Sequence, residues 1–314
     1  MSPALSLVAD IGGTNTRVAL AHGKAVDGSS VRRYANREAS GLDEVLHRYL
    51  SDTDTDRGQI TGACVAAAGP VHDGVAELTN LPWRIDRNML TEILSADKVA
   101  VLNDLQAQGH AIGHLAPDMI TQILPQPKVS PRAAKLVVGV GTGFNAAPIY
   151  DTAQGRFVPP SECGHMSLPP CGPDSAVLTA RLRDTHGFAA VEEALSGRGI
   201  EAIHTYLHDE NRPAAEIMAA LEAGNSQAEG TARLFVRVLG TVIGDLALIH
   251  LPFGGIHLVG GVNRAFAPYL HRFGFAAAMH DKGRFGPFLE QFGVAVVSDD
   301  YAALTGCASH LVHL

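Results

Sequence analysis

The sequence has few cysteines, few aromatic residues and no run of basic residues. The four cysteines, Cys64, Cys163, Cys171 and Cys307, form no CxxC pair, so a disulfide framework is excluded and a reducing cytoplasm is favoured. The net charge of -8, with no local cluster of lysine and arginine, excludes a nucleic-acid partner. Any anionic ligand must therefore be held by local groups rather than by a basic surface.

Long hydrophobic runs are also missing. The apolar segment Leu5 to Ala9 is too short for a signal peptide and lacks its basic flank. The most apolar long stretch, Thr241 to Val262, is broken by Asp245, His250, Pro252 and two Gly-Gly pairs, so it cannot span a bilayer. We expect neither a targeting segment nor a membrane partner.

What the chain does have is length, apolar residues and glycine. Its 314 residues are 46% hydrophobic, which is enough for a sizeable core and for two domains. The 33 glycines matter for function, because backbone N–H groups in glycine turns and at helix N-termini bind anions without net positive charge.

Short apolar runs alternate with helical patterns, which predicts an α/β fold. The expected strands are Leu5 to Asp10, Arg17 to Leu20, Gly62 to Ala67, Val99 to Leu102 and Lys135 to Val140. From about residue 174 to 249 the pattern is mainly helical, and it includes a long helix from Ser226 to Ile249. Strands return at Gly255 to Val259 and Gly293 to Val297, before a last helix from Tyr301 to Leu311.

Three glycine-rich turns follow predicted strands. The first comprises Gly12, Gly13, Thr14 and Asn15 after Asp10, where glycines let the backbone approach a phosphate and Asp10 can hold Mg2+ through water. An ordinary hairpin turn explains it equally well. The second comprises Gly141, Thr142 and Gly143, with Thr142 as a phosphate donor. It is neither a Walker P-loop nor a dinucleotide fingerprint, so dehydrogenase chemistry is disfavoured.

The third turn is Gly260-Gly261, where a flat adenine could lie against exposed backbone or where a packed strand end simply needs small residues. Asn103 and Asp104 lie where a predicted strand ends and a predicted helix begins. This is the usual place for ligand-binding groups in an open α/β sheet. Taken alone, Asp104 is more readily explained as a helix N-cap than as a catalytic base. His165 beside two cysteines suggests zinc only weakly, since no fourth ligand is apparent.

The motifs together resemble the bacterial glucokinase family over nearly the whole chain. DIGGTNTR, TNLPW, VLNDLQAQGHAI, GVGTGF, SECGH, EEALSG, GGIHLVGG and DKGRF occur in family order. The three glycine turns resemble the phosphate 1, phosphate 2 and adenosine motifs of actin-like sugar kinases. The zinc motif of clustered cysteines that marks the repressor and kinase branch of this superfamily is missing from the sequence.

The resemblance implies an actin-like (ribonuclease H-like) two-domain fold with an interdomain cleft, commonly in a homodimer. We expect a small α/β domain over residues 1–110, to which a C-terminal helix at about 299–314 returns, and a large α/β domain over 111–298. By the family's motifs, Asp104 is the base that accepts the proton of the attacking hydroxyl. The sugar-binding residues are Asn103, Asp104, Glu162, His165 and Glu192, and the nucleotide-binding residues are Asp10, Gly12, Gly13, Thr14, Asn15, Gly141, Thr142, Gly143, Gly260 and Gly261.

Two positions depart from the family pattern. Asn145 stands where family members usually carry glycine, so we expect a narrower phosphate 2 turn, with asparagine tolerating the left-handed backbone. Cys163, within SECGH, also replaces a residue that is often glycine. Trp83 matches a family tryptophan, for which we expect a packing role.

The sequence thus predicts a cytoplasmic kinase that uses ATP and Mg2+ to phosphorylate glucose, or a similar hexose, at the carbon 6 hydroxyl. One alternative is a kinase for another hexose, such as mannose or an amino sugar. The other is a sugar-binding regulator with little catalysis, for which Asn145 is the one sequence signal.

Overall fold

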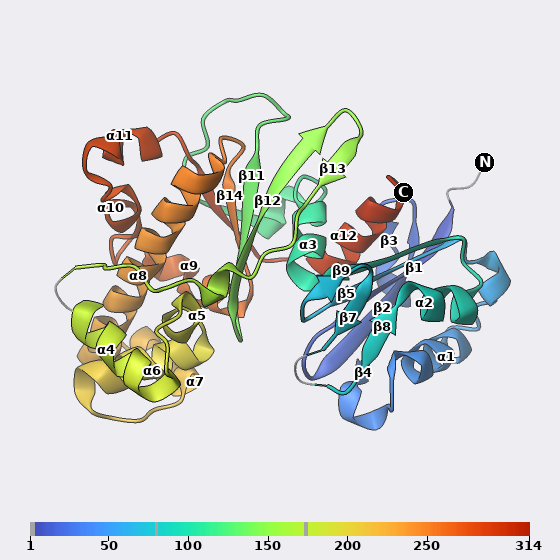
Figure 1. Cartoon of the computed structure of the whole chain (residues 1–314), viewed down its shortest axis with the longest axis horizontal. Helices are drawn as coiled ribbons and strands as arrows, with labels where there is room; N and C mark the ends of the chain where they lie inside the picture. Colours follow the sequence, from blue (N-terminus) through green and yellow to red (C-terminus); the bar gives the residue numbers. More distant parts are fainter. Residues whose placement is uncertain (1–3, 79–80, 173–174) are drawn as a thin grey trace. The chain divides into compact units, whose positions relative to one another are not determined.

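The computed structural model describes residues 4–78, 81–172 and 175–314 (Figure 1). Thr79 and Asn80 of the TNLPW motif, and the predicted start of the helical region at residue 174, lie outside the described residues. The chain forms two compact units. Unit 1 comprises residues 1–117, 151–160 and 299–314, and unit 2 comprises residues 118–150 and 161–298.

Unit 1 is built on a sheet whose main path runs β3-β2-β1-β5-β9, with β4 paired to β2. These strands are β1 (Leu5–Ile11), β2 (Asn15–His22), β3 (Ala25–Val26), β4 (Arg32–Ala35), β5 (Gly62–Ala67) and β9 (Lys98–Asn103). β1 pairs antiparallel with β2 and parallel with β5, and β5 pairs parallel with β9. A separate antiparallel sheet contains β6 (Val71–His72), β7 (Val75–Glu77) and β8 (Arg84–Asp86).

Helices cover both faces of the unit 1 sheet (Figure 1). Alternate residues of a strand point to opposite faces. Leu7 and Ala9 pack in a core with α1 (Leu42–Asp52) and α2 (Arg87–Leu94), which also buries Trp83 as expected. Val8, between them in sequence, packs instead with α3 (Asp104–Ala111) and α12 (Ala302–Leu311). Burial on both faces explains why these strands read as continuous apolar runs.

Unit 2 contains the second large sheet, in the order β10-β15-β14-β11-β12-β13, of which β13 is counted with unit 1. Its strands are β10 (Ile120–Leu124), β11 (Lys135–Val140), β12 (Phe144–Thr152), β13 (Gly155–Phe157), β14 (Ile256–Val259) and β15 (Val294–Val297). The helices of unit 2 are α4 (Ser175–His186), α5 (Val191–Ala194), α6 (Gly197–His208), α7 (Ala214–Glu222), α8 (Ser226–His250), α9 (Gly261–Leu270), α10 (Phe275–His280) and α11 (Gly286–Leu289).

Short 3-10 helices complete the chain: η1 (Gly28–Ser30), η2 (Asn36–Glu38), η3 (Arg57–Gln59), η4 (Pro117–Met119), η5 (Cys163–His165) and η6 (Gly283–Phe285). The predicted strand at Lys135 to Val140 is confirmed residue for residue, and the long predicted helix appears as α8. No helix among the described residues is long and apolar enough to cross a bilayer.

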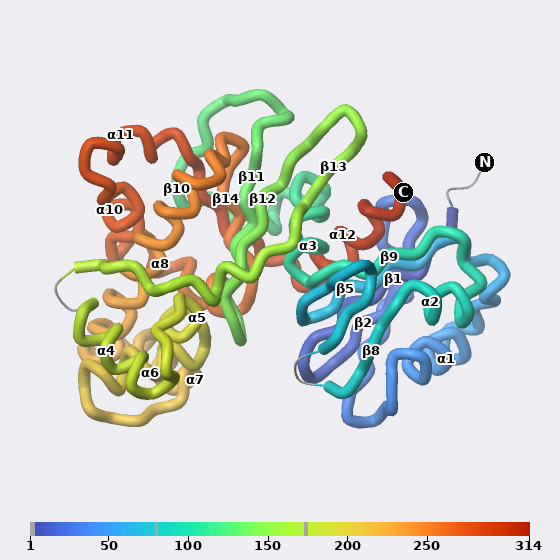
Figure 2. The backbone as a smooth tube through the Cα atoms, viewed as in Figure 1, coloured from blue at the N-terminus to red at the C-terminus, as the bar shows by residue number. Residues whose placement is uncertain are grey.

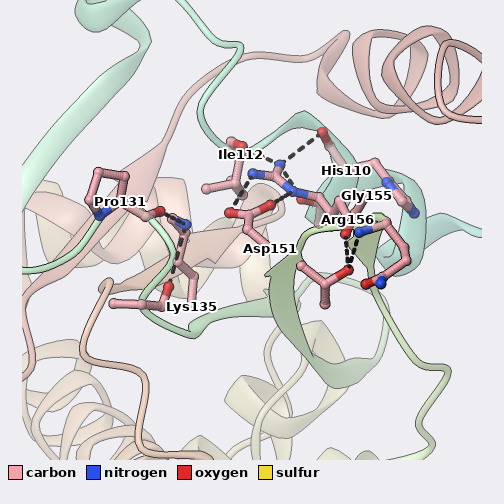
Figure 3. A network of polar contacts seen from close by, with 11 residues as sticks. His110, Ile112, Pro131, Lys135, Asp151, Gly155 and Arg156 are labelled. Carbon is pink, nitrogen blue, oxygen red and sulfur yellow. Dashed lines mark hydrogen bonds and ion pairs between the residues drawn. The ribbon is translucent and has the colours of Figure 1, made fainter.

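A charged side chain closes the C-terminal end of α3. Nη1 of Arg156 donates to the carbonyls of Gly109 and His110, at 3.3 and 3.2 Å, and to that of Ile112 (Figure 3). Nε of Arg156 also pairs with Oδ1 of Asp151 at 2.7 Å. The last carbonyls of a helix lack partners within it, and a cation is favoured there. Arg156 therefore fixes the helix that begins with the predicted catalytic residue.

Candidate active site

The sheet register brings several predicted residues of unit 1 to one edge. Ile11 of β1 pairs with Ala67 of β5, which pairs with Asn103 of β9. The three parallel strands therefore end together, at the edge where α/β sheets present ligand-binding groups. Asp10, the turn at residues 12–15 and the Asn103-Asp104 junction all lie at this edge, as their sequence positions predict.

The first glycine turn is held in shape by a buried amide. The N–H of Gly12 donates to the carbonyl of Asn15 at 3.0 Å. Nδ2 of Asn36 donates to the carbonyl of Gly12 at 2.8 Å, and Oδ1 of Asn36 accepts from the hydroxyl of Thr16 at 2.8 Å. Asn36 is only 2% exposed, whereas Gly13 and Thr14 are exposed at the tip. The turn thus presents backbone and hydroxyl groups that solvent or a ligand can reach.

Asp10 carries the carboxylate next to this turn. Nη1 of Arg17 pairs with Oδ2 of Asp10 at 3.1 Å. Burial raises the pKa of Asp10, and the neighbouring Arg17 opposes that shift. A carboxylate oxygen is a ligand type that Mg2+ prefers, so Asp10 stays the candidate for the predicted water-mediated Mg2+ site.

The junction of β9 and α3 decides which residue caps the helix. The N-cap is Asn103, not Asp104: Oδ1 of Asn103 accepts from the N–H of Leu105 at 2.9 Å, and Gln106 completes a capping box. Nδ2 of Asn103 donates to the carbonyl of Gly69 at 3.0 Å. Asp104 is the first residue of the helix, where the helix dipole favours a negative charge. The capping explanation of Asp104 is therefore wrong, although its Oδ1 also accepts from Leu105 at 2.8 Å.

Unit 2 repeats this arrangement at the ends of its parallel strands. Gly139 of β11 pairs with Val259 of β14, so the turn at residues 141–143 and the Gly260-Gly261 pair lie at the same edge. Gly260 has φ of 95°, and a Cβ there would lie 2.4 Å from the carbonyl oxygen of Val140. Only glycine fits that position. Gly261 then begins α9, so backbone N–H groups of a helix N-terminus face this edge.

The second glycine turn is held by groups from α5 and α6. The N–H of Gly141 donates to the carbonyl of Gly143 at 2.9 Å, and the N–H of Gly197 donates to the carbonyl of Gly141 at 2.9 Å. Directly after the turn, the N–H of Phe144 donates to Oε2 of Glu192 at 2.9 Å. Thr142 is exposed at the tip, as Thr14 is in the first turn.

The predicted sugar-binding residues of unit 2 lie close enough to influence one another. Glu162 and His165 are exposed on the segment that follows β13 and contains η5 (Figure 2). Burial of its carboxyl group raises the pKa of Glu162; His165 lowers that pKa and Glu192 raises it. Arg198 pairs with both Glu192 and Glu193, and its hydrogen bond lowers the pKa of Glu193.

Comparison with known proteins decides the family. The glucokinase family model matches residues 7–314. The chain belongs to the glucokinase family. A glucokinase of Chromohalobacter salexigens is 31% identical over 98% of this chain and 97% of its own length. The family transfers phosphate from ATP to glucose, and this chain is a kinase of that family.

Solved structures agree on the fold. A glucokinase from an Antarctic psychrotroph superposes with a TM-score of 0.86, at 29% identity and with 98% of each chain covered. A ROK family glucokinase from Streptomyces griseus, in complex with glucose and AMPPNP, has a TM-score of 0.65 at 19% identity, covering 97% of this chain and 98% of its own. The predicted actin-like two-domain fold of the glucokinase family is thus confirmed.

The expectation for Asn145 was wrong. Asn145 is not part of the phosphate 2 turn and does not have a left-handed backbone; it lies in β12, paired with Gly139. Its side chain instead reaches the segment around Glu162: Nδ2 donates to the carbonyl of Ser161, and Oδ1 accepts from the N–H of Cys163 at 3.2 Å. The Asn145 side chain therefore does not narrow the phosphate 2 turn at residues 141–143.

Two residues that support the glycine turns, one in each unit, were missed from the sequence. Asn36 holds the first turn, and Arg198 neutralises the carboxylates beside the second. Asn36 lies 24 residues from its partner Gly12, so no local pattern links them. Arg198 follows EEALSG closely in sequence, so its placement near Glu192 and Glu193 was a signal that could have been used.

Proposed function

We propose that the protein transfers the γ-phosphate of ATP to the carbon 6 hydroxyl of glucose, with Asp104 as general base. The observation that carries this proposal is the position of Asp104 as the first residue of α3, with the capping role taken by Asn103. The positive end of the helix dipole favours the charged form of a carboxylate in that position. A charged carboxylate within hydrogen-bonding distance of a hydroxyl can accept its proton as the oxygen attacks phosphorus.

The sugar is recognised by Asn103, Glu162, His165 and Glu192 together with Asp104. Each of these side chains has hydrogen-bonding atoms, and a hexose presents several hydroxyls. A buried acceptor that loses its hydroxyl partner costs enough free energy to discriminate between sugars. Asn103 and Asp104 belong to unit 1, and the two glutamates and the histidine belong to unit 2.

The nucleotide is held by backbone groups rather than by cationic side chains. In the proposal, Gly12 to Asn15 and Gly141 to Gly143 bind phosphate oxygens, with donors from Thr14 and Thr142, and Gly260-Gly261 lies against the adenosine. Asp10 holds Mg2+ through a water molecule. The ion, when bound, neutralises developing negative charge on the phosphate oxygens.

The Streptomyces griseus structure supports this choice of ligands, because that related fold is in complex with glucose and AMPPNP. By family resemblance we further propose that the protein acts as a homodimer in the cytoplasm. Sedimentation of the purified protein at micromolar concentration tests the dimer.

The deciding experiment measures ADP release with ATP and Mg2+ on glucose, mannose, fructose, glucosamine and N-acetylglucosamine. We expect rapid turnover on glucose and a loss of about 10²- to 10⁴-fold in kcat for Asp104→Asn and Asp104→Ala. Asp86→Ala is the matched control, because Asp86 is a true N-cap whose Oδ1 accepts from Met89 at 2.9 Å. That control should lose stability and keep kcat.

Other outcomes have clear meanings. Preference for another sugar would keep the mechanism and change the substrate. If folded protein binds glucose but shows no turnover on any sugar, the proposed kinase function is wrong and a sugar-binding regulator is favoured. Asp104→Asn with undiminished kcat would remove Asp104 from the role of base.

A further inference from the structure

The segment that carries Glu162 has little regular structure of its own. Glu162 and His165 are joined through the single turn of η5, where the N–H of His165 donates to the carbonyl of Glu162 at 3.2 Å. A short turn of this kind cannot fix a carboxylate without contacts from outside, because a loop orders only as far as its neighbours hold it. The backbone around Glu162 must therefore be held by contacts from other elements.

Asn145 contacts the residues on both sides of Glu162. Its Nδ2 donates to the carbonyl of Ser161, the residue before. Its Oδ1 accepts from the N–H of Cys163, the residue after, at 3.2 Å. One planar amide thus uses its donor and its acceptor to span Glu162, an arrangement that glycine or alanine at residue 145 cannot supply.

The two departures from the family pattern are in contact. Asn145 and Cys163, the two departures noted in the sequence analysis, lie 18 residues apart in sequence, and Sγ of Cys163 lies 3.5 Å from Oδ1 of Asn145. Burial raises the pKa of the Cys163 thiol, so it stays protonated and can donate to that oxygen. The Asn145 side chain therefore contacts residue 163 through both its backbone and its thiol. We call this pair of residues the Asn145–Cys163 clamp.

The neighbouring residue holds the second sugar-binding glutamate. Phe144 donates its N–H to Glu192 at 2.9 Å. A Cβ on Gly164 would lie 2.0 Å from the carbonyl oxygen of Phe144, so the Glu162 segment passes directly against this backbone. Residues 144 and 145, which follow the phosphate 2 turn immediately, thus hold both glutamates.

We infer that Asn145 is a positioning residue for sugar recognition, acting through the Asn145–Cys163 clamp to fix Glu162 relative to the second glycine turn. The inference rests on the proposed function, in which Glu162 binds the sugar. Asn145 does not touch the phosphate in this account. Its loss should weaken sugar binding and leave ATP binding unchanged.

Steady-state kinetics of Asn145→Gly, Cys163→Gly and the double variant test the clamp. We expect Asn145→Gly to raise the KM for glucose about tenfold, with kcat changed less and the KM for ATP unchanged, since the side-chain hydrogen bonds to Ser161 and Cys163 are lost. Cys163→Gly keeps its backbone N–H and should raise the KM for glucose about threefold. The effects of mutations at residues in contact are non-additive. The increase in the glucose KM of the double variant should therefore be well below the product of the increases in the two single variants.

Asn145→Asp tests the clamp through the pH dependence of the glucose KM, which would not change if Asn145 had only a structural role. It keeps an acceptor for Cys163 but loses the donor to Ser161, and it adds a carboxylate beside Glu162, in addition to that of Glu192. We expect a higher KM for glucose and, because the added negative charge raises the pKa of Glu162 further, an acid side of the pH profile of that KM that moves to higher pH. Asn225→Ala is the matched control: its amide caps α8, with Oδ1 accepting from Gln227 and Ala228 at 3.0 Å each. It should lower thermal stability without changing either KM.

Hydrogen exchange tests the clamp independently of turnover. In Asn145→Gly, the amides of residues 161–165 should exchange faster than in the wild type, and in Asn225→Ala they should not. If the wild type lacks activity on every hexose, the proposed function fails, while faster exchange would still support the clamp. A change of less than twofold in the glucose KM of an active Asn145→Gly, or unchanged exchange at 161–165, overturns the inference. Equal increases in the KM for ATP and for glucose also overturn it.

Discussion

The two units are built on the same strand plan, yet they hold their glycine turns by different chemistry. In unit 1, β1 pairs antiparallel with β2 and parallel with β5; in unit 2, β11 pairs antiparallel with β12 and parallel with β14. The first turn is supported by the neutral, buried Asn36. The second is supported by the charged Glu192, which in turn pairs with Arg198.

This difference assigns the turns different duties. A neutral buried amide fixes a backbone shape regardless of pH and salt, so the first turn is a rigid phosphate-binding element. A carboxylate that supports the second turn and is also a predicted sugar ligand links phosphate binding to sugar binding.

Gly164→Ala should be the most damaging of these changes. The new Cβ would lie 2.0 Å from the carbonyl oxygen of Phe144, which is backbone and cannot move aside easily. We expect a loss of more than about 3 kcal/mol in the free energy of unfolding, together with most sugar affinity. In unit 1, Gly12→Ala places its Cβ 3.4 Å from the carbonyl oxygen of Asn15 and should cost less than about 1 kcal/mol. Urea denaturation of both variants measures the two values, and equal losses would contradict the steric account.

Asn36→Ala and Glu192→Gln should have different effects, because Asn36 supports the first turn and Glu192 the second. It leaves the carbonyl of Gly12 and the hydroxyl of the fully buried Thr16 without their partner, at a cost of about 1–3 kcal/mol. The KM for ATP should rise with little change in that for glucose. Glu192→Gln keeps an acceptor for Phe144, so it should preserve stability and raise the KM for glucose instead. The same pattern of effects in both variants would show that the turns do not differ as described.

Acid should destabilise unit 1 through two histidines packed ring to ring. The rings of His110 and His310 are 4.5 Å apart, and burial lowers the pKa of His110 to about 3 and that of His310 to about 4. His110 also faces His313, Arg156 and Asp151. An unfolded histidine takes up a proton near pH 6.5 while the folded one stays neutral. Stability is therefore full above that pH and falls as pH drops, by about 1.4 kcal/mol per unit for each histidine.

Replacement of His110 by phenylalanine should remove one such contribution. The free energy of unfolding, measured by urea at intervals from pH 7 to pH 5, should then fall less steeply than in the wild type. His47→Gln, at an exposed position on α1, is the control and should keep the wild-type slope. An unchanged slope in His110→Phe would mean that other groups govern acid unfolding.

Sequence alone predicted the elements that have strong local signals. Buried parallel strands such as β11 read as apolar runs, and α8 reads by its period, so both were placed within a residue. The glycine turns and the Asn103-Asp104 junction follow from their positions at strand ends. Contacts between distant segments could not be predicted this way. Asn145 was assigned to the turn because it lies two residues after Gly143 in the motif, but its side chain contacts a segment 16 to 18 residues away.

Arg198→Ala should give the smallest effect and the finest test of the charged support. The Arg198 side chain is 44% exposed, so its pairs with Glu192 and Glu193 should contribute less than about 1 kcal/mol to stability. Its removal leaves Glu192 less neutralised, and Glu192 already raises the pKa of Glu162. That pKa should rise further, so the charged form of Glu162 is lost at a higher pH on acidification. In Arg198→Ala, the rise in the glucose KM on acidification should begin at a higher pH than in the wild type. In Arg198→Lys it should begin at the wild-type pH. A profile that does not move would separate Arg198 from sugar recognition and leave the second turn supported by Glu192 alone.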